Sequence, residues 1–223
     1  MKQGFILIDK PSGITSHDVV DKLRKITGIK KIGHAGTLDP FAKGLLILGI
    51  GREFTKKLFI FQKEAKEYIA ILKLGFESNT FDIDGKIVEK KIKKIPEEKE
   101  VKRILKNFLG EILQTPPIFS AKKIKGEKLY NLARRGVRVR PKKIKVKIFK
   151  ISVLKYKFPY LKIRVKCSGG TYIRSLANDI GKKLKCGAIV QELTRTKIGK
   201  FSLKEATKLL RLTTQNWEKF LIS

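Results

Sequence analysis

The segment from Leu161 to Ser168, "LKIRVKCS", constrains the fold most strongly, because apolar and polar residues alternate along its whole length. A period of two places successive side chains on opposite faces of a β-strand, here with one face in the core and one in water. The inward set is Leu161, Ile163, Val165 and Cys167, and the outward set is Lys162, Arg164, Lys166 and Ser168. The preceding stretch "KIKVKIFKISVL" alternates similarly, so the two predict neighbouring antiparallel strands with one solvated face.

The rest of the chain predicts further strands and helices in mixed order. Strands are expected at residues 4–9, 44–51, 66–75 and within 188–201, and helices at residues 15–28, 96–109, 128–136, 171–184 and 203–212. Thr15 followed by Asp18 is a capping-box pattern, and Gly28 is a typical helix end. With no internal repeat and no linker, this mixture predicts an α+β fold, helices on a mixed sheet, in a single domain spanning residues 1–223.

Composition excludes several classes of protein. No run of about 18 apolar residues occurs, so a membrane span is not expected. The N-terminal apolar run is too short for a signal peptide and is interrupted by Asp9. Two cysteines, Cys167 and Cys186, and two histidines, His17 and His34, are too few for a disulfide framework or a Cys/His zinc site. The sequence therefore predicts a cytoplasmic protein without a metal.

Positive charge dominates the composition. The chain has 52 Lys and Arg against 20 Asp and Glu, a formal net charge of +32. A lysine-rich surface also accompanies growth at high temperature, where ion-pair networks stabilise proteins. An imbalance of this size more often indicates a polyanionic partner, because a protein that neutralises phosphates releases their condensed counterions. Binding of nucleic acid is therefore the first functional expectation.

The basic residues also cluster along the chain. Residues 121–150 hold 13 Lys and Arg and a single acid, Glu127. Only Tyr130 and Phe149 are aromatic there, so the stretch favours gripping of phosphates over stacking of bases. Because residues 114–141 show little regular periodicity, we expect an inserted arm at about 114–143.

Asp39 is the best candidate for a reactive group. It lies in "GHAGTLDPFAKGLL", where Gly36 permits an unusual φ and Pro40 restricts Asp39 to extended conformations. The chain has no nucleophilic-serine elbow and no phosphate-cradling glycine loop, so chemistry by a carboxylate without a cofactor is what remains. A structural aspartate in an Asx-turn is the alternative interpretation.

Arg174 is the second candidate. It follows "SGGTY" and falls in the first turn of a predicted helix. A guanidinium there could pair with Asp39, keep it ionised and orient it as a nucleophile. A salt bridge at the edge of the core is the alternative, and the sequence does not establish that the two residues meet.

Five motifs in order resemble the TruB family of tRNA pseudouridine synthases. They are "DKPSGITSHDVV", "GHAGTLDPFAKGLL", "KEYIAILKLGFESNTFDIDG", "TPPIFSAKKIKGEKLYNLARRG" and "CSGGTYIRSLANDIG", and the likeness runs from about Gly4 to Phe201. The resemblance implies the pseudouridine synthase fold, a mixed and largely antiparallel sheet flanked by helices, with an inserted basic RNA-binding arm. It also implies isomerisation of uridine 55 in the tRNA T loop by base flipping, without cofactor or metal.

The same resemblance implies the roles of individual residues. Asp39 matches the catalytic aspartate, Tyr68 the tyrosine that stacks on the target base, and Arg174 the arginine that pairs with the aspartate. Leu193 in "QELTR" matches an apolar residue of the uracil pocket, and His34 a histidine that replaces the displaced base. Further substrate-binding positions are Lys10, Thr37, Asp82 and Lys123. Tyr68 and Leu193 would also suit the core of any strand.

The expected partner is the T-stem loop of tRNA. Many bacterial members carry a C-terminal RNA-binding domain, whereas only about 20 residues follow Phe201 here, so no separate domain of that kind is expected. A stand-alone, monomeric enzyme without guide RNA or protein partner follows. The alternatives are a non-catalytic RNA-binding protein, such as an RNA chaperone or a ribosome-associated protein, and a synthase acting on another stem-loop. A pure binder has no need of Asp39, Tyr68 and Arg174 together.

Overall fold

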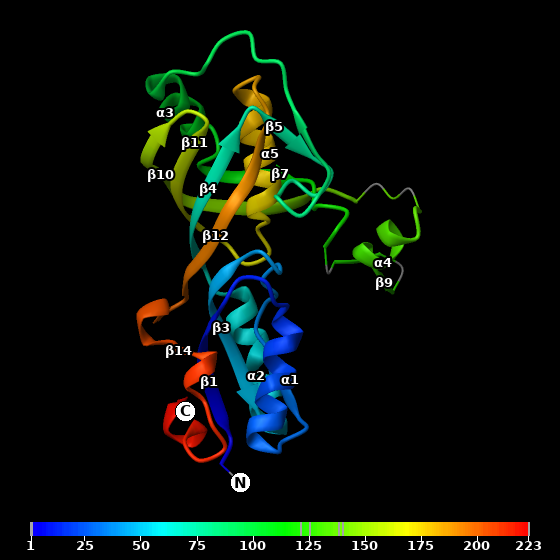
Figure 1. The fold of residues 1–223 in the computed structure, drawn as a ribbon, viewed down its shortest axis with the longest axis vertical. Coiled ribbons are helices and arrows are strands. Elements are labelled where there is room, and N and C mark those ends of the chain that lie inside the picture. The colour runs from blue at the N-terminus through cyan, green and yellow to red at the C-terminus, as the bar shows by residue number, and fades with distance from the viewer. Residues whose placement is uncertain (1, 121, 125, 138, 140, 223) are drawn as a thin grey trace. The chain divides into compact units, whose positions relative to one another are not determined.

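The computed structural model describes residues 2–120, 122–124, 126–137, 139 and 141–222 (Figure 1). The chain forms two compact units, which we call unit 1 (Met1–Tyr68 with Leu193–Ser223) and unit 2 (Ile69–Glu192). Strands β4 (Lys66–Leu74) and β12 (Ala188–Ile198) contribute residues to both units. Unit 1 thus combines the two ends of the chain, and unit 2 is its middle.

Unit 1 is built around two long antiparallel strands. β1 and β3 pair in register from Gly4 opposite Ile50 to Lys10 opposite Gly44, and β3 also pairs in parallel with the end of β12. The elements of unit 1 are β1 (Gly4–Lys10), α1 (Ser16–Thr27), β2 (Ile32–His34), β3 (Lys43–Ile50), α2 (Arg52–Lys63), β13 (Phe201–Ser202), β14 (Thr207–Lys208) and β15 (Leu221–Ile222).

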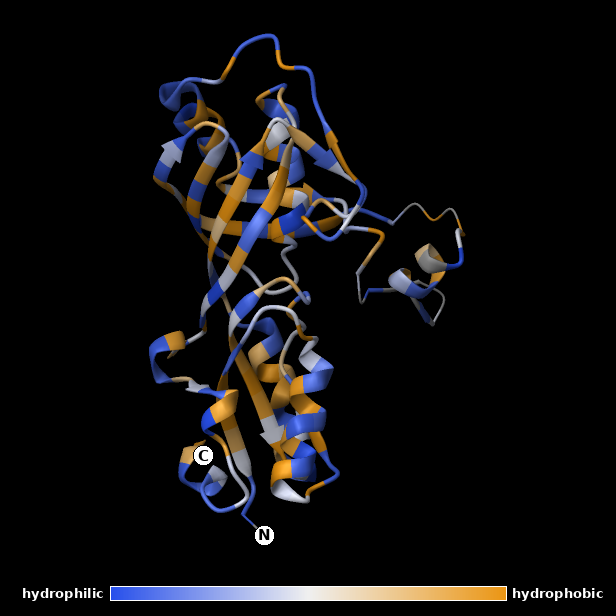
Figure 2. Ribbon diagram, in the orientation of Figure 1, coloured by the Kyte–Doolittle hydropathy of each residue, from blue (hydrophilic) through white to orange (hydrophobic). Residues whose placement is uncertain are grey.

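Both faces of β1 and β3 are buried, which explains their continuous apolar runs. Alternate residues such as Ile6 and Leu48 pack with α1 on one face, while Leu7 and Ile47 pack with α2 on the other. The hydropathy colouring shows these strands as mainly hydrophobic (Figure 2). The strands expected at residues 4–9 and 44–51 are therefore confirmed.

The helices of unit 1 confirm one prediction and add an element. Thr15 caps α1 in a complete capping box with Asp18, and Gly28 ends the helix with φ of 71°. Helix α2 is not predicted by the sequence analysis, although Phe54, Leu58 and Phe61 lie on one helical face and pack into the core.

The helix expected at residues 203–212 is wrong. The structure has two short 3₁₀ helices there, η1 (Leu203–Glu205) and η2 (Leu209–Arg211), separated by strand β14. Thr207 and Lys208 pair in parallel with Ile8 and Asp9 of β1. The edge of β1 therefore supplies hydrogen bonds that outcompete a helix, as tertiary context overrides local propensity.

Unit 2 contains a sheet in the order β12-β4-β11-β10-β7. Its larger elements are β7 (Gly110–Gln114), β10 (Ile144–Lys157), β11 (Tyr160–Cys167), α3 (Glu98–Lys106) and α5 (Ile173–Lys183), and its smaller ones are β5 (Phe76–Ser78), β6 (Ile87–Glu89), β8 (Lys123–Ile124), β9 (Glu127–Lys128) and α4 (Leu129–Arg134). Helix α3 occupies only the middle of the predicted 96–109 segment. The use of residues 114–143 as an RNA-binding arm stays a prediction.

The alternation in β11 is confirmed. Its four inward residues have no exposed surface, and β10 pairs with it in antiparallel fashion, with Ile151 opposite Val165. The fold is α+β, with a mixed and mostly antiparallel sheet flanked by helices, as predicted. Among the described residues, no helix is both long and apolar enough to span a membrane.

Candidate active site

The loop that carries Asp39, between β2 and β3, is held through its main chain. The Ser16 hydroxyl accepts a hydrogen bond from the Leu38 amide at 2.9 Å and donates to the Leu38 carbonyl at 3.2 Å. On the other side of Asp39, the Ser12 hydroxyl donates to the Phe41 carbonyl at 2.8 Å. Leu38 and Phe41 are buried, whereas Asp39 is only half-buried. The carboxylate therefore stands on a loop fixed before and after it.

Lys10 holds the residue that follows Asp39. Its Nζ donates to the carbonyls of Pro11 at 2.8 Å, Ile14 at 2.7 Å and Pro40 at 3.4 Å, and none of its surface is exposed. Burial lowers the pKa of Lys10 to about 8, and the negative charge of Asp39 opposes this shift. All three Nζ protons are directed at carbonyls, so Lys10 supports the Asp39 loop in this structure, and its contact with the substrate stays a prediction.

Arg195, on β12, holds the start of the same loop and the strand that follows it. Its Nε donates to the Leu45 carbonyl at 2.7 Å and its Nη2 to the Gly36 carbonyl at 3.1 Å, and the side chain is 1% exposed. Gly44 has φ of 107°, and a Cβ there would lie 2.4 Å from the Arg195 carbonyl oxygen. Glycine at 44 is thus required by both the backbone conformation and the close approach of β12.

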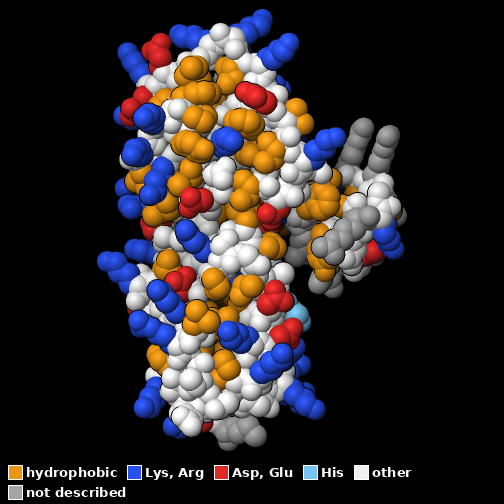
Figure 3. Space-filling view, viewed as in Figure 1, with side chains coloured by type: hydrophobic (Ala, Val, Ile, Leu, Met, Phe, Trp, Pro, Cys, Tyr) orange, Lys and Arg blue, Asp and Glu red, His pale blue; other side chains and the backbone are white. Residues whose placement is uncertain are grey.

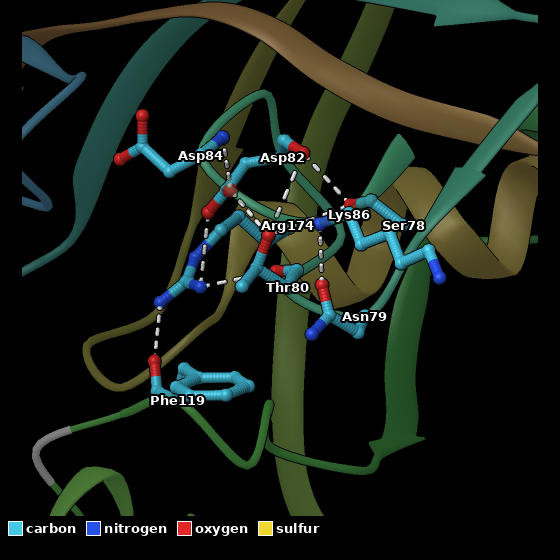
Figure 4. Close-up of polar contacts among 8 residues, drawn as sticks. All are labelled: Ser78, Asn79, Thr80, Asp82, Asp84, Lys86, Phe119 and Arg174. Atoms are coloured by element: carbon cyan, nitrogen blue, oxygen red, sulfur yellow. Dashed lines mark hydrogen bonds and ion pairs between the residues drawn. The ribbon is translucent and has the colours of Figure 1, made fainter. Parts of the chain in front are cut away.

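Arg174, near the start of α5, lies in a second polar cluster (Figure 4). Its Nη1 is 3.0 Å from the Asp82 carboxylate and 3.1 Å from the Thr80 carbonyl, and its Nη2 donates to the Phe119 carbonyl at 2.9 Å. The side chains of Arg174 and Asp82 are 5% and 3% exposed. This is a buried ion pair whose remaining polar atoms are largely hydrogen-bonded, the arrangement that a buried charge requires.

The loop that supplies Asp82 is stabilised by its own side chains. The Thr80 hydroxyl donates to Asp82 Oδ1 at 2.5 Å, and the Asp84 amide donates to the same oxygen at 3.0 Å. The Ser78 hydroxyl donates to the Asp82 carbonyl at 2.7 Å. Partial burial, and then the neighbouring Asp82, raise the pKa of the Asp84 carboxyl. The Asp82 carboxylate is thus fixed to orient Arg174.

Two further residues set the position of α5 in unit 2. The fully buried Gln114 exchanges hydrogen bonds with Tyr172, donating to its carbonyl at 3.0 Å and accepting from its amide at 2.8 Å. The Ser175 hydroxyl donates to the Thr115 carbonyl at 2.7 Å. These contacts lie at Tyr172 and Ser175, before and after Arg174, and fix the first turn of the helix that carries it.

The remaining predicted residues lie in unit 1, with one exception. Tyr68 on β4 and Leu193 on β12 are buried, His34 ends β2, and Thr37 is exposed in the Asp39 loop. Lys123 belongs to β8, and its side chain lies outside the described ones. Asp39 and Arg174 belong to different units, so their pairing stays a prediction. Within the described residues, no group of three His, Cys, Asp or Glu side chains is placed to hold a metal ion.

A protein-family model shows which family the chain belongs to. The model described as "TruB family pseudouridylate synthase (N terminal domain)" matches residues 24–173. The chain belongs to this family. A second model, described as "tRNA pseudouridylate synthase B C-terminal domain", matches residues 174–220, so the two matches meet at Arg174.

Relatives of this TruB-family chain carry a consistent name. The tRNA pseudouridine synthase B of Clostridium tetani is 49% identical over 98% of this chain and 75% of its own length. The tRNA pseudouridine synthase B of Chlamydia abortus is 46% identical over 92% of this chain and 86% of its own length. Pseudouridylate synthases are isomerases, and this chain is an enzyme of that class.

Solved structures agree with the fold. A chain of "a Cbf5-Nop10-Gar1 Complex" is 32% identical with a TM-score of 0.74 and covers 96% of this chain. A chain of an "H/ACA RNP bound to a substrate RNA containing 2'-deoxyuridine" is 30% identical with a TM-score of 0.70 and covers 97%. This chain spans about half the length of each, 54% and 55%.

Sequence reasoning missed the residues that position the two candidate groups. Arg195 lies two residues after the buried Leu193 on β12, so both side chains face the same side of the strand. A charged residue at such an inward position indicates a structural role, and this was the signal in the sequence. Ser12 and Ser16 gave no signal, because serine is common in turns and at helix starts, and Gln114 gave none at the end of the short strand β7.

Proposed function

We propose that the chain is a tRNA pseudouridine synthase that isomerises uridine 55 of the T loop, with Asp39 as the nucleophile. The main support is the fixed loop of unit 1, in which Lys10, Ser12, Ser16 and Arg195 hold the main chain on both sides of a half-buried carboxylate. The tRNA specificity is inferred from relatives named tRNA pseudouridine synthase B.

The reaction is chemically balanced without a co-reactant. The bond between N1 of uracil and C1′ of ribose breaks, the base rotates, and a bond between C5 and C1′ forms while C5 loses a proton and N1 gains one. Asp39 forms a transient covalent adduct, with C1′ of the sugar or with C6 of the base, which keeps the intermediate bound to the enzyme. No metal or cofactor is invoked.

The other residues act around this adduct. Tyr68 stacks on the flipped uracil and accepts a proton from it, and Leu193 forms the apolar wall of the uracil pocket. Arg174, oriented by Asp82, pairs with Asp39 in the productive complex and keeps it ionised. His34 replaces the displaced base, which leaves its stack at a cost of roughly a few kcal/mol. Thr37 and Lys123 contact the RNA.

The enzyme is proposed to act in the cytoplasm, as a monomer, without guide RNA or protein partner. The solved relatives in complexes named with Nop10 and Gar1 are less similar, at 32% identity, than the relatives named tRNA pseudouridine synthase B, at 49%. Purified protein alone should therefore modify tRNA.

The test is incubation with an unmodified tRNA transcript, without added metal, nucleotide or second protein, followed by carbodiimide-dependent primer extension. We expect a stop at uridine 55 that is absent with Asp39→Asn and retained with the matched control Asp21→Asn on α1. The affinity of Asp39→Asn for tRNA should stay within a few-fold, because phosphate contacts dominate affinity.

Three outcomes would contradict the proposal. If Asp39→Asn lost tRNA binding to the same extent as it lost activity, Asp39 would no longer be assigned as the nucleophile. A stop at a uridine outside the T loop, which is kept when the T-loop uridine is replaced by cytidine, would place the target in another stem-loop. Tight binding without any pseudouridine would identify a non-catalytic RNA-binding protein.

A further inference from the structure

The hairpin of β10 and β11 in unit 2 has one face made largely of cations. Its register places Lys150 opposite Lys166, Ser152 opposite Arg164 and Lys155 opposite Lys162. The alternate residues of β11, including Ile163 and Val165, are fully buried, and their partners on β10, Ile151 and Val153, are partly buried. We call the outward set the hairpin basic face; its members are Lys150, Lys155, Lys162, Arg164 and Lys166.

Counter-charges are missing from this hairpin. Residues 144–167 contain eight Lys and Arg and no Asp or Glu. Within the described part of the chain, no member of the hairpin basic face forms an ion pair; the neighbouring Lys145 pairs with Glu111 of β7 at 3.0 Å. In the space-filling view, Lys and Arg side chains gather where Figure 1 labels β10 and β11 (Figure 3).

Other basic surfaces of the chain are arranged differently. On α3, Lys102 lies 2.6 Å from Glu98, and next to β5 and β6, Lys90 lies 2.7 Å from Glu77. Mixed charges of this kind reduce self-repulsion. The hairpin does the opposite, because Lys150 with Lys166 and Lys155 with Lys162 are like charges directly opposite one another, which destabilises a sheet.

We propose that the hairpin basic face binds the phosphate backbone of the RNA substrate, outside the uridine-binding site. Along β11 the outward side chains recur at about 6.6–6.8 Å. The neighbouring strand β10, about 4.7–4.9 Å away, adds a second row that an irregularity between Val153 and Lys155 interrupts. Two such rows on a rigid sheet present a lattice of cations to a polymeric anion, and bound phosphates relieve the like-charge repulsion. The identity of the RNA as tRNA rests on the proposed function.

RNA is favoured over an anionic membrane by the form of the surface. Membrane-surface binding typically combines a basic face with an apolar face that enters the lipid, as in an amphipathic helix. Here the apolar face of the hairpin is buried in the core of unit 2, with Ile163, Val165 and Cys167 fully buried. The hairpin also exposes the apolar side chains of Phe149, Leu154 and Tyr160, but most of its exposed side chains are cations.

The test compares two triple variants that remove the same charge from unit 2. The hairpin variant is Lys150→Gln, Lys155→Gln and Lys162→Gln, and the control is Lys91→Gln, Lys93→Gln and Lys99→Gln, which changes three exposed lysines near or on α3. Binding of a fluorescent unmodified tRNA transcript is followed by anisotropy between about 50 and 200 mM salt.

We expect the hairpin variant to lower the slope of log affinity against log salt by about 2–3, since each lost phosphate contact removes about 0.7–0.9. The control should lower it by less than about 1. At about 0.15 M salt, affinity should fall at least roughly tenfold in the hairpin variant only. A Lys→Arg triple at the same three positions should restore the slope.

Equal slopes for the hairpin and control variants would overturn the proposal. Retention of the tRNA slope together with loss of binding to phosphatidylserine vesicles would assign the face to membranes instead. Folding failure is not expected, because removal of repelling charges should keep or raise the unfolding midpoint. Binding is measured independently of turnover, so a wild-type protein that binds tRNA through this face without modifying it contradicts only the proposed function.

Discussion

The loop of Asp39 in unit 1 and the loop of Asp82 in unit 2 are held by different interactions. In unit 1, the buried cations Lys10 and Arg195 donate to backbone carbonyls. In unit 2, the buried cation Arg174 meets a carboxylate at 3.0 Å as well as two carbonyls. One loop is organised by neutral acceptors and the other by an ion pair.

This difference separates the roles of the two aspartates. The anchors of the Asp39 loop are main-chain atoms of neighbouring residues, so substitution of Asp39 itself leaves them in place. The Asp82 side chain is itself the anchor in unit 2, and its removal leaves Arg174 buried with an uncompensated charge. Substitution of Asp39 should therefore remove activity while leaving the stability of the protein unchanged, whereas substitution of Asp82 should lower its stability.

The largest expected effect on stability is that of Asp82→Ala. Breaking a buried ion pair by removing one partner costs about 3–5 kcal/mol, and the free energy of unfolding in urea should fall by that amount. The matched control, Asp84→Ala, removes the neighbouring carboxylate, whose side chain is mostly exposed, and should cost less than about 1 kcal/mol. A small loss for Asp82→Ala would mean that carbonyls alone suffice to hold Arg174, as they hold the cations of unit 1.

The second prediction concerns Lys10→Met. The substitution leaves the carbonyls of Pro11 and Ile14 without the Lys10 donor, whereas the Pro40 carbonyl keeps its hydrogen bond from the Gly13 amide at 2.8 Å. The free energy of unfolding at pH 7 should therefore fall by about 1–3 kcal/mol. Displacement of the Asp39 loop should lower kcat by up to about 100-fold, with KM little changed. Lys22→Met, at an exposed position of α1, is the control. An unchanged kcat would show that the loop keeps its position without Lys10.

The pH dependence of the same variant sharpens this test. The pKa of Lys10 is about 8 in the folded protein against an ordinary value of 10.5, so the unfolded chain binds more protons between these values. The stability of the wild type relative to Lys10→Met should therefore rise as pH increases from about 8 to 10.5, and should level above that range. Denaturation curves that run parallel across this window would contradict the burial of a titrating lysine.

The smallest effect is expected at an exposed ion pair, which sets the baseline for the comparison. Lys57 and Glu53 lie 2.5 Å apart on α2 with 48% and 65% of their side chains exposed. Glu53→Gln should cost about 0.3–0.5 kcal/mol, and the loss should disappear in about 1 M salt, where the Debye length is about 3 Å. A cost comparable to that of Asp82→Ala would show that distance rather than burial decides the strength of a pair.

Elements with strong periodicity were predicted well from the sequence. The inward set of β11 and the capping box of α1 are confirmed, because both depend on residues close together in the chain. Residues 203–212 were predicted wrongly because the hydrogen bonds that decide their structure come from β1, about 200 residues earlier. Helix α2 was missed because its apolar face is short and mixed with lysines.

The sequence by itself determined the chemistry available to this protein: a carboxylate at Asp39 in a stiff loop, a guanidinium at Arg174, and a large excess of positive charge. Tertiary structure decided which groups hold them. Arg195 reaches the Asp39 loop from 156 positions away in the sequence, and Asp82 reaches Arg174 across 92. Such pairings follow from the packing of strands and the burial of charge, which bring together residues that no local pattern links.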